Sequence, residues 1–205
     1  MDPVEPKTRV PAVPRALPEK SRSLFRLRIE LLDVKPAIWR GVLVPGSITL
    51  PKLHMTFQHA MGWTDSHLHE FVIGGRRYSV DLDDDWGPAE LIDERRFRLE
   101  KVLGPRVRTF DYLYDFGDNW HHAVIVEERD GLAPEDGRWP VCVAGERASP
   151  PEDVGGPWGY ADFVDIVSNP RHPEYRSTLA WCGGSFSPEH FDVDRVNERL
   201  RRIKA

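Results

Sequence analysis

The sequence RVRTFDYLYDFGDNWHHAVIVEE, residues 106–128, predicts a β-hairpin around which the rest of the chain is organised. Aromatic and β-branched residues alternate with polar residues in its first arm, as is typical of a half-buried strand. The second arm starts at Asn119 and ends in a β-branched run. Between the arms, Gly117 can adopt a positive φ, and the flanking Asp115 and Asp118 can accept hydrogen bonds from turn amides.

The second arm predicts a strand with two different ends. A period of two places Asp118, Trp120 and His122 on one face together with Val124 and Val126. This face is polar and aromatic beside the turn and apolar away from it. The pattern predicts a strand that leaves the core and enters a cleft.

Length and composition indicate one globular domain after an N-terminal tail. The chain has 205 residues, of which 40% are hydrophobic and 30% are charged, and this length suffices for a substantial core. Residues 1–22 contain five prolines with interspersed basic residues, which predicts a disordered tail. Residues 23–205 are expected to form a single domain.

Charge and cysteine usage exclude several function classes. A net charge of −5 argues against bulk electrostatic binding of nucleic acid. No apolar run approaches the roughly 18 residues of a membrane span, and the N-terminus has no signal-like apolar segment. Cys142 and Cys182 lie far apart without a partner motif. Together these features predict a cytoplasmic protein without a membrane partner.

Hairpins and helices can be assigned along the rest of the chain. Strands are expected at 24–31 and 38–44, a helix at 50–61 with Thr49 as N-cap and Gly62 as its stop, and a hairpin around Gly74–Gly75. Residues 160–203 carry helical apolar stripes. The predicted fold is α+β: a mainly antiparallel twisted sheet of hairpins, β-grasp-like at its start, packed by the 50–61 helix and a C-terminal helical segment.

Residues 139–160 show little regular pattern but contain tryptophan, tyrosine and cysteine, which predicts an ordered lid or wall. A cleft between this loop and the 106–128 hairpin is the candidate site. Its candidate residues are Asp115, Asp118, Trp120, His122, Cys142, Glu152, Asp153 and Tyr160.

The cofactor is not specified by the sequence, but these residue types could hold a divalent metal ion. Histidines two residues apart on a strand project side by side, so His67 and His69 could join Asp118 and His122 as ligands if their strands are neighbours. The structural alternative is that Asp118 bonds turn amides, Trp120 fills the core and His122 is hydrogen-bonded and inert. His54 and His59 are expected at the surface or flank of the 50–61 helix.

The same choice between a role in the site and a purely structural role applies to the 139–160 loop. Glu152 and Asp153 could supply carboxylates to the cleft, or could cap a local turn. Cys142 has neither an adjacent base nor a paired cysteine, which argues against a nucleophile.

Five segments carry a resemblance to a known family: IWRGVLVPGSITLPKLHMTFQHAMGW, HLHEF, YDFGDNWHH, CVAGERASPPEDVGGPWGY and FDVDRVNERL. They resemble the plasmid pRiA4b open-reading-frame-three-like family, also labelled as insertion-element passenger proteins of TnpR type, over about residues 23–203. The resemblance implies a bacterial α+β domain. Ser149 stands where relatives often carry a cysteine, which puts a paired-thiolate site in doubt. The serine, arginine clamp and helix-turn-helix of a resolvase are not evident.

Three hypotheses follow. The first is a mobile-element accessory or binding protein that uses the cleft for a protein or small ligand. The second is a metal-dependent hydrolase, acting for example on phosphate esters, with His67, His69, Asp118 and His122 as ligands and Glu152 or Asp153 as base. The third and weakest is DNA association through the basic helix. Its arginines are Arg195, Arg199, Arg201 and Arg202.

Overall fold

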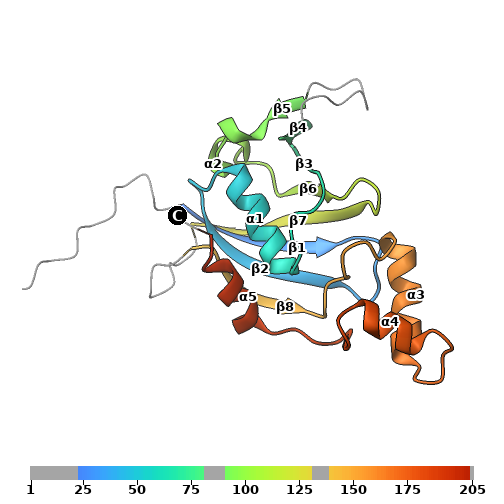
Figure 1. The fold of residues 1–205 in the computed structure, drawn as a ribbon. Coiled ribbons are helices and arrows are strands. Elements are labelled where there is room, and N and C mark those ends of the chain that lie inside the picture. Colours follow the sequence, from blue (N-terminus) through green and yellow to red (C-terminus); the bar gives the residue numbers. More distant parts are fainter. Residues whose placement is uncertain (1–22, 81–90, 131–138, 204–205) are drawn as a thin grey trace, which may run out of the picture.

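A computed structural model describes residues 23–80, 91–130 and 139–203. Within them, eight strands form one sheet in the order β5-β4-β3-β6-β7-β1-β2-β8 (Figure 1). The strands are β1 (Leu24–Leu31), β2 (Ile38–Pro45), β3 (His69–Ile73), β4 (Arg76–Ser79), β5 (Leu91–Asp93), β6 (Thr109–Tyr114), β7 (Trp120–Arg129) and β8 (Val141–Glu146). The helices are α1 (Leu50–Met61), α2 (Leu99–Val102), α3 (Gly156–Ser168), α4 (Tyr175–Trp181) and α5 (Val193–Leu200), with a 3₁₀ turn, η2, at Glu94–Arg96. The predicted α+β class is confirmed. The predicted tail at 1–22 lies outside the described residues.

Hairpins build most of the sheet, as predicted. β1–β2, β3–β4 and β6–β7 are antiparallel pairs, and among the described strands only β4 and β5 pair in parallel. β1, β2 and α1 follow in the expected order, but β3 joins the sheet beyond β6. The β6–β7 hairpin therefore separates β3 from β1. This arrangement decides which histidines meet.

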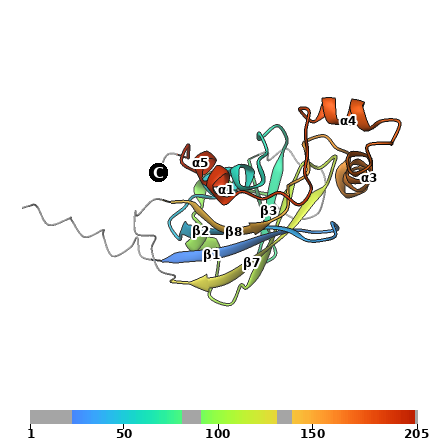
Figure 2. The same ribbon diagram turned by 90° about the horizontal axis from the view of Figure 1, so that it is seen from below.

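One face of the sheet carries the core. In β7, Trp120, His122, Val124 and Val126 are buried, so the predicted alternation is confirmed. The helix α1 packs its apolar side onto this face. The buried residues of that side begin at Leu50 and recur every three or four positions along the helix. Figures 1 and 2 show α1 and α5 side by side on the same face. None of the described helices combines the length and apolarity of a bilayer span.

The second group of helices marks one end of the molecule. α3 and α4 lie beside the tip of the β6–β7 hairpin in both views (Figures 1 and 2). Gly62 ends α1 with a φ of 89°, as predicted. Thr49 occupies the N-cap position, but its side chain makes no capping hydrogen bond.

Two local predictions are wrong. The positive-φ residues of the hairpin turn are Asp115 at 56° and Asn119 at 54°, rather than Gly117; Asp and Asn tolerate this region because their short side chains bond locally. The 139–160 segment is only partly a loop. Its start forms edge strand β8 against β2, and its end forms the first turn of α3. The connection that remains, residues 147–155, reaches the hairpin turn.

Candidate functional site

Four side chains from three separate segments converge beside the hairpin turn. The imidazole Nε2 of His67 lies 3.0 Å from Asp153 Oδ1, 3.5 Å from Asp115 Oδ2 and 3.6 Å from Glu152 Oε2. His67 precedes β3, Asp115 lies in the β6–β7 turn, and Glu152 and Asp153 lie in the connection from β8 to α3. We call these four residues the carboxylate–histidine cluster.

The hairpin turn orients Asp115. Its backbone N–H donates to the Leu68 carbonyl at 2.9 Å, which places the turn against the segment that carries His67. Its Oδ1 accepts the N–H groups of Gly117 and Asp118 at 3.0 and 3.3 Å. The turn therefore holds one carboxylate oxygen, and the other faces His67. The prediction that an aspartate bonds back to turn amides is confirmed.

Glu152 is held in the same way. Its Oε1 accepts the Thr64 N–H at 2.6 Å and the Thr64 hydroxyl at 3.1 Å. The Tyr114 hydroxyl accepts the Ser66 N–H and donates to both carboxylate oxygens at 3.2 Å. Burial, together with the charge of Glu152, raises the pKa of Tyr114, so this hydroxyl remains a donor.

The loop that carries Asp153 is attached to the hairpin turn. Asp118 Oδ2 accepts the Gly155 N–H at 3.1 Å. A Cβ on Gly156, whose φ is 68°, would lie 2.5 Å from the Asp118 carbonyl oxygen, so only glycine fits this approach. The indole of Trp63 donates to the Pro150 carbonyl at 2.9 Å on the other side of the loop. These contacts explain how the loop reaches His67.

The cluster carries more negative than positive charge. Three carboxylates surround one imidazole, and none of the three pairs with a lysine or arginine among the described residues. The contacts to His67 are short enough for ion pairs, yet its buried Nε2 has no partner with hydrogen-bond geometry in the described chain. The groups therefore converge on a point without bonding one another. Carboxylate oxygens and an imidazole nitrogen are suitable ligands for a divalent cation.

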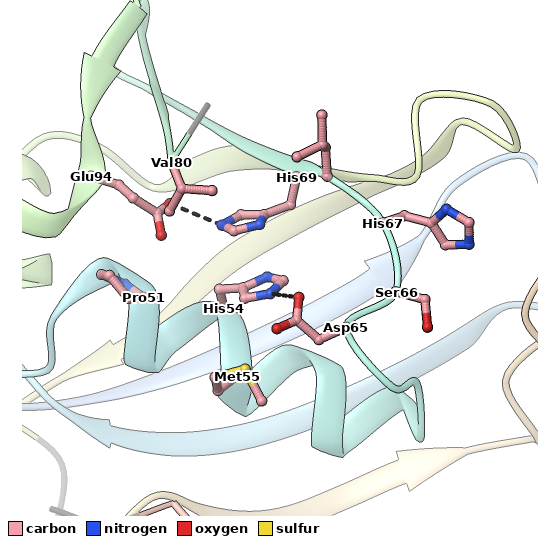
Figure 3. Close-up of a pocket in the computed structure, with 10 residues that line it drawn as sticks. Pro51, His54, Met55, Asp65, Ser66, His67, His69, Val80 and Glu94 are labelled. Atoms are coloured by element: carbon pink, nitrogen blue, oxygen red, sulfur yellow. Dashed lines mark hydrogen bonds and ion pairs between the residues drawn. The ribbon is translucent and has the colours of Figure 1, made fainter. Parts of the chain in front are cut away.

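A second group of polar side chains lies on the other side of the 65–69 segment. Figure 3 shows His69 above His54, with His67 pointing away from both. The two stacked rings are 3.5 Å apart with an angle of 6° between their planes. His69 Nε2 lies 2.9 Å from Oε2 of Glu94, which is fully buried. These groups line a pocket of about 600 Å³ that also touches His67.

Hydrogen bonds around His54 form a closed cycle. The Asp65 N–H donates to Gln58 Oε1 at 3.0 Å, so the Gln58 amide nitrogen donates to the Tyr112 hydroxyl at 3.0 Å. That hydroxyl donates to His54 Nδ1, and His54 Nε2 donates back to Asp65 Oδ1, both at 2.8 Å. The cycle requires a neutral His54 with the proton on Nε2. Burial, reinforced by His69, lowers the pKa of His54 to about 4.

The structure separates the four predicted metal ligands. His67 lies in the cluster, whereas His69 pairs with Glu94 and Asp118 bonds the loop. His122 lies in the core, where its Nδ1 is 3.1 Å from the Tyr112 carbonyl oxygen and burial lowers its pKa to about 4. β6 lies between β3 and β7, so the two histidine-bearing strands are not neighbours.

The other predicted cleft residues divide between the cluster and the core. Asp115, Glu152 and Asp153 meet at His67, and Trp120 is buried in the core. Cys142 and Tyr160 are also buried; burial raises the pKa of Cys142 to about 11 and that of Tyr160 to about 12.

Sequence reasoning missed several residues near the pocket. His54 is 3% exposed rather than on the surface, and Asp65, Glu94, Thr64 and Tyr114 were not assigned to a site. The position of His54 could have been found, since it follows Leu50 by four residues on the buried stripe of α1. The other four depend on contacts between distant segments.

Comparison with known proteins places this architecture in a family. The family model described as "Plasmid pRiA4b ORF-3-like protein" matches residues 23–195, which include the whole cluster. The chain belongs to this family. The pRiA4b ORF-3-like chain is 39% identical over 163 residues to "Uncharacterized protein y4hQ" of Sinorhizobium fredii (strain NBRC 101917 / NGR234), covering 80% of this chain and 82% of that protein. The resemblance seen in the sequence is thereby confirmed.

A solved structure has the same fold. The crystal structure of the protein of unknown function MM3350 from Methanosarcina mazei Go1 superposes with a TM-score of 0.75 and is 34% identical. The match covers 84% of this chain and 96% of that chain. The pRiA4b ORF-3-like chain therefore shares its fold with this archaeal protein.

Proposed function

We propose that the carboxylate–histidine cluster binds a divalent metal ion and that this pRiA4b ORF-3-like protein is a metal-dependent hydrolase. The observation that carries the proposal is that the two oxygens of Asp115, and the two oxygens of Glu152, make different contacts. Asp115 is held by hydrogen bonds through Oδ1, and Glu152 is held through Oε1 by Thr64. The other oxygen of each carboxylate faces His67 Nε2, and that of Glu152 also accepts the Tyr114 hydroxyl. Such outer contacts orient the ligands of a metal ion.

Charge favours a cation over a purely structural network. A protonated His67 would supply one positive charge against three carboxylates, whereas a divalent ion with a neutral imidazole leaves a smaller imbalance. The site is also open to solvent, since the Asp153 side chain is 70% exposed. The ligand atoms of His67, Asp115 and Asp153 lie within 4.8 Å of one another, and three protein ligands leave coordination positions for water on an ion that prefers six. When bound, the ion would lower the pKa of such a water and so supply a nucleophile.

The adjoining pocket indicates the charge of a substrate. Asp65 and Glu94 contribute carboxylates to its lining, and no lysine or arginine lines it among the described residues. Met55, Leu68 and Val80 supply apolar surface. These walls favour a neutral or cationic substrate over the phosphate esters suggested by ligand types alone.

The test compares metal-dependent hydrolysis of a neutral and an anionic chromogenic substrate. Metal-free protein reconstituted with Mn²⁺ or Zn²⁺ should hydrolyse p-nitrophenyl acetate faster than p-nitrophenyl phosphate. His67→Ala should abolish the metal-dependent rate. His121→Ala is the matched control. His121 lies on the face of β7 opposite to the core, and its imidazole is 3.0 Å from Asp111 Oδ1. Equal rates in the two variants would refute the assignment.

A second candidate function is the accessory or binding role on mobile elements. It is favoured by two exposed aromatic residues. Phe116 in the hairpin turn is 53% exposed and Trp158 at the start of α3 is 87% exposed, and such residues commonly anchor interfaces. The partner would then dock on the surface formed by the hairpin turn and the start of α3, in place of the cleft expected from the sequence. Phe116→Ser with Trp158→Ser should abolish any partner binding while leaving metal binding intact; unchanged binding of an isolated partner would dismiss this role.

A further inference from the structure

Arg40 carries a buried charge without a carboxylate partner. It is 3% exposed, and all five of its N–H groups donate to uncharged oxygens. The acceptors are the carbonyls of Trp39, Ala60, Glu146 and Arg147 and the hydroxyl of Ser149, at 2.8–3.1 Å. Its donors are therefore satisfied, but its charge is not compensated within the described chain. An uncompensated buried charge is costly.

Two more arginines face the same region from α5. Arg195 and Arg199, four residues apart on one side of the helix, line a pocket of about 360 Å³ together with Arg40. Neither guanidinium has an ion pair or hydrogen bond among the described residues. Burial lowers the pKa of Arg199, and the positive charges of Arg195 and Arg202 lower it further.

The one carboxylate in the described pocket lining caps a helix through one of its oxygens. Asp192 caps α5, and its Oδ1 accepts the N–H groups of Asp194 and Arg195 at 3.0 and 3.1 Å. The described lining thus has three arginines against one carboxylate. Phe186 and Phe191 supply aromatic walls, and the Phe191 ring packs 4.7 Å from the Arg40 guanidinium.

We propose that this pocket, between α1, α5 and the 147–155 connection, binds a small organic anion: a carboxylate or phosphate monoester with an apolar body. Arg195 and Arg199 donate hydrogen bonds to the anion, Arg40 supplies a buried positive charge beneath it, and the aromatic walls hold the apolar part. The site is separate from the carboxylate–histidine cluster and has the opposite charge. It does not depend on the proposed metal.

The pocket also refines the sequence-based DNA hypothesis. That hypothesis assigned one role to all four arginines of the basic helix, but Arg199 is half-buried and lines the pocket with Arg195. Arg201 and Arg202 are exposed at the end of the helix. A concave site with aromatic walls suits a small anion better than a duplex, whose phosphates would be contacted by exposed arginines.

The experiment is calorimetric titration of full-length, metal-free protein with phenyl phosphate, benzoate, inorganic phosphate and neutral benzyl alcohol. Phenyl phosphate or benzoate should bind saturably, inorganic phosphate more weakly, and benzyl alcohol least. Arg195→Gln and Arg199→Gln should each weaken binding at least about tenfold, the loss of a charge-assisted contact. Arg201→Gln, which changes the exposed residue directly after the same helix, should leave the affinity unchanged.

Thermal unfolding of each variant without ligand verifies that the variant is folded. Phenyl phosphate or benzoate should raise the thermal midpoint of the wild type. Failure of both organic anions to bind at about 10 mM would overturn the proposal. So would equal binding of benzyl alcohol, or a loss in Arg201→Gln as large as that in Arg199→Gln. Binding of a DNA duplex that is abolished by Arg201→Gln would replace the small anion with nucleic acid.

Discussion

Replacing Tyr112 with phenylalanine removes one oxygen atom from the closed hydrogen-bond cycle. Tyr112 is fully buried, and its hydroxyl accepts from Gln58 and donates to His54. Tyr112→Phe therefore leaves one donor of Gln58 and one acceptor of His54 without a partner. Each buried unpaired group costs about 1–3 kcal/mol, so the free energy of unfolding should fall by about 2–6 kcal/mol. For a chain of this size, that loss lowers the thermal midpoint by about 5–15 °C.

The assay is urea unfolding followed by tryptophan fluorescence, with thermal unfolding by circular dichroism. Tyr78→Phe is the control: Tyr78 is 3% exposed, but its hydroxyl makes no hydrogen bond within the described chain. It should lose less than about 1 kcal/mol. If Tyr112→Phe loses no more than Tyr78→Phe, the cycle does not fix the proton positions as argued.

Three further predictions concern pH, backbone and metal. The native pKa of both His54 and His122 is lowered to about 4, whereas histidines of the unfolded chain have a pKa of about 6.5 and therefore bind more protons below that pH. The free energy of unfolding should fall as pH drops from about 6.5 to 4, by up to about 3 kcal/mol for each histidine. Urea midpoints that stay constant over that window would contradict this prediction. In Gly156→Ala the new Cβ would lie 2.5 Å from a backbone oxygen of the hairpin turn, whereas in Gly183→Ala, at a similarly positive φ, it would meet open space. Gly156→Ala should therefore destabilise the protein by about 2 kcal/mol more than Gly183→Ala. Equal free energies of unfolding would show that the turn moves to accept the extra carbon. Zn²⁺ at 100 times its Kd should stabilise the wild type by about 2.7 kcal/mol and leave Asp115→Asn unaffected, as thermal unfolding would show; the same stabilisation of that variant would remove Asp115 from the site.

The sequence predicted the hairpins well because the period of a strand is fixed by the backbone. Alternation over residues 106–128 was enough to identify the buried face of Trp120 and His122. The hairpin turn nominated Asp115, and the proline-containing loop nominated Glu152 and Asp153, since such segments concentrate polar groups that act at surfaces.

The ligand set could not be predicted because it depends on non-local register. His69 pairs opposite Tyr114 across β3 and β6. The next residues outward, Leu68 and Asp115, are then hydrogen-bonded, which brings His67 close to Asp115. Tyr112 in turn pairs with His122, so β6 separates His69 from that histidine. Nothing within either local segment specifies this strand order.

The same reasoning explains the missed His69–Glu94 pair and the Arg40 pocket. Glu94 reaches His69 only because β5 joins the sheet edge in parallel with β4. Arg40 meets Arg199 only when α5 packs beside α1. Each pairing joins residues at least 25 positions apart. The hydrophobic pattern predicts which segments form strands and helices, but it does not predict which polar side chains meet when those segments pack together.

Metal content is the measurement that tests the central claim most directly. Untagged wild type, His67→Ala and His121→Ala should be stripped of metal, supplied with Zn²⁺ or Mn²⁺, desalted and analysed by elemental mass spectrometry. The cluster predicts one ion per chain in the wild type and in His121→Ala, and none in His67→Ala. A wild type that retains neither metal, or a His67→Ala variant that retains a full ion, would contradict it.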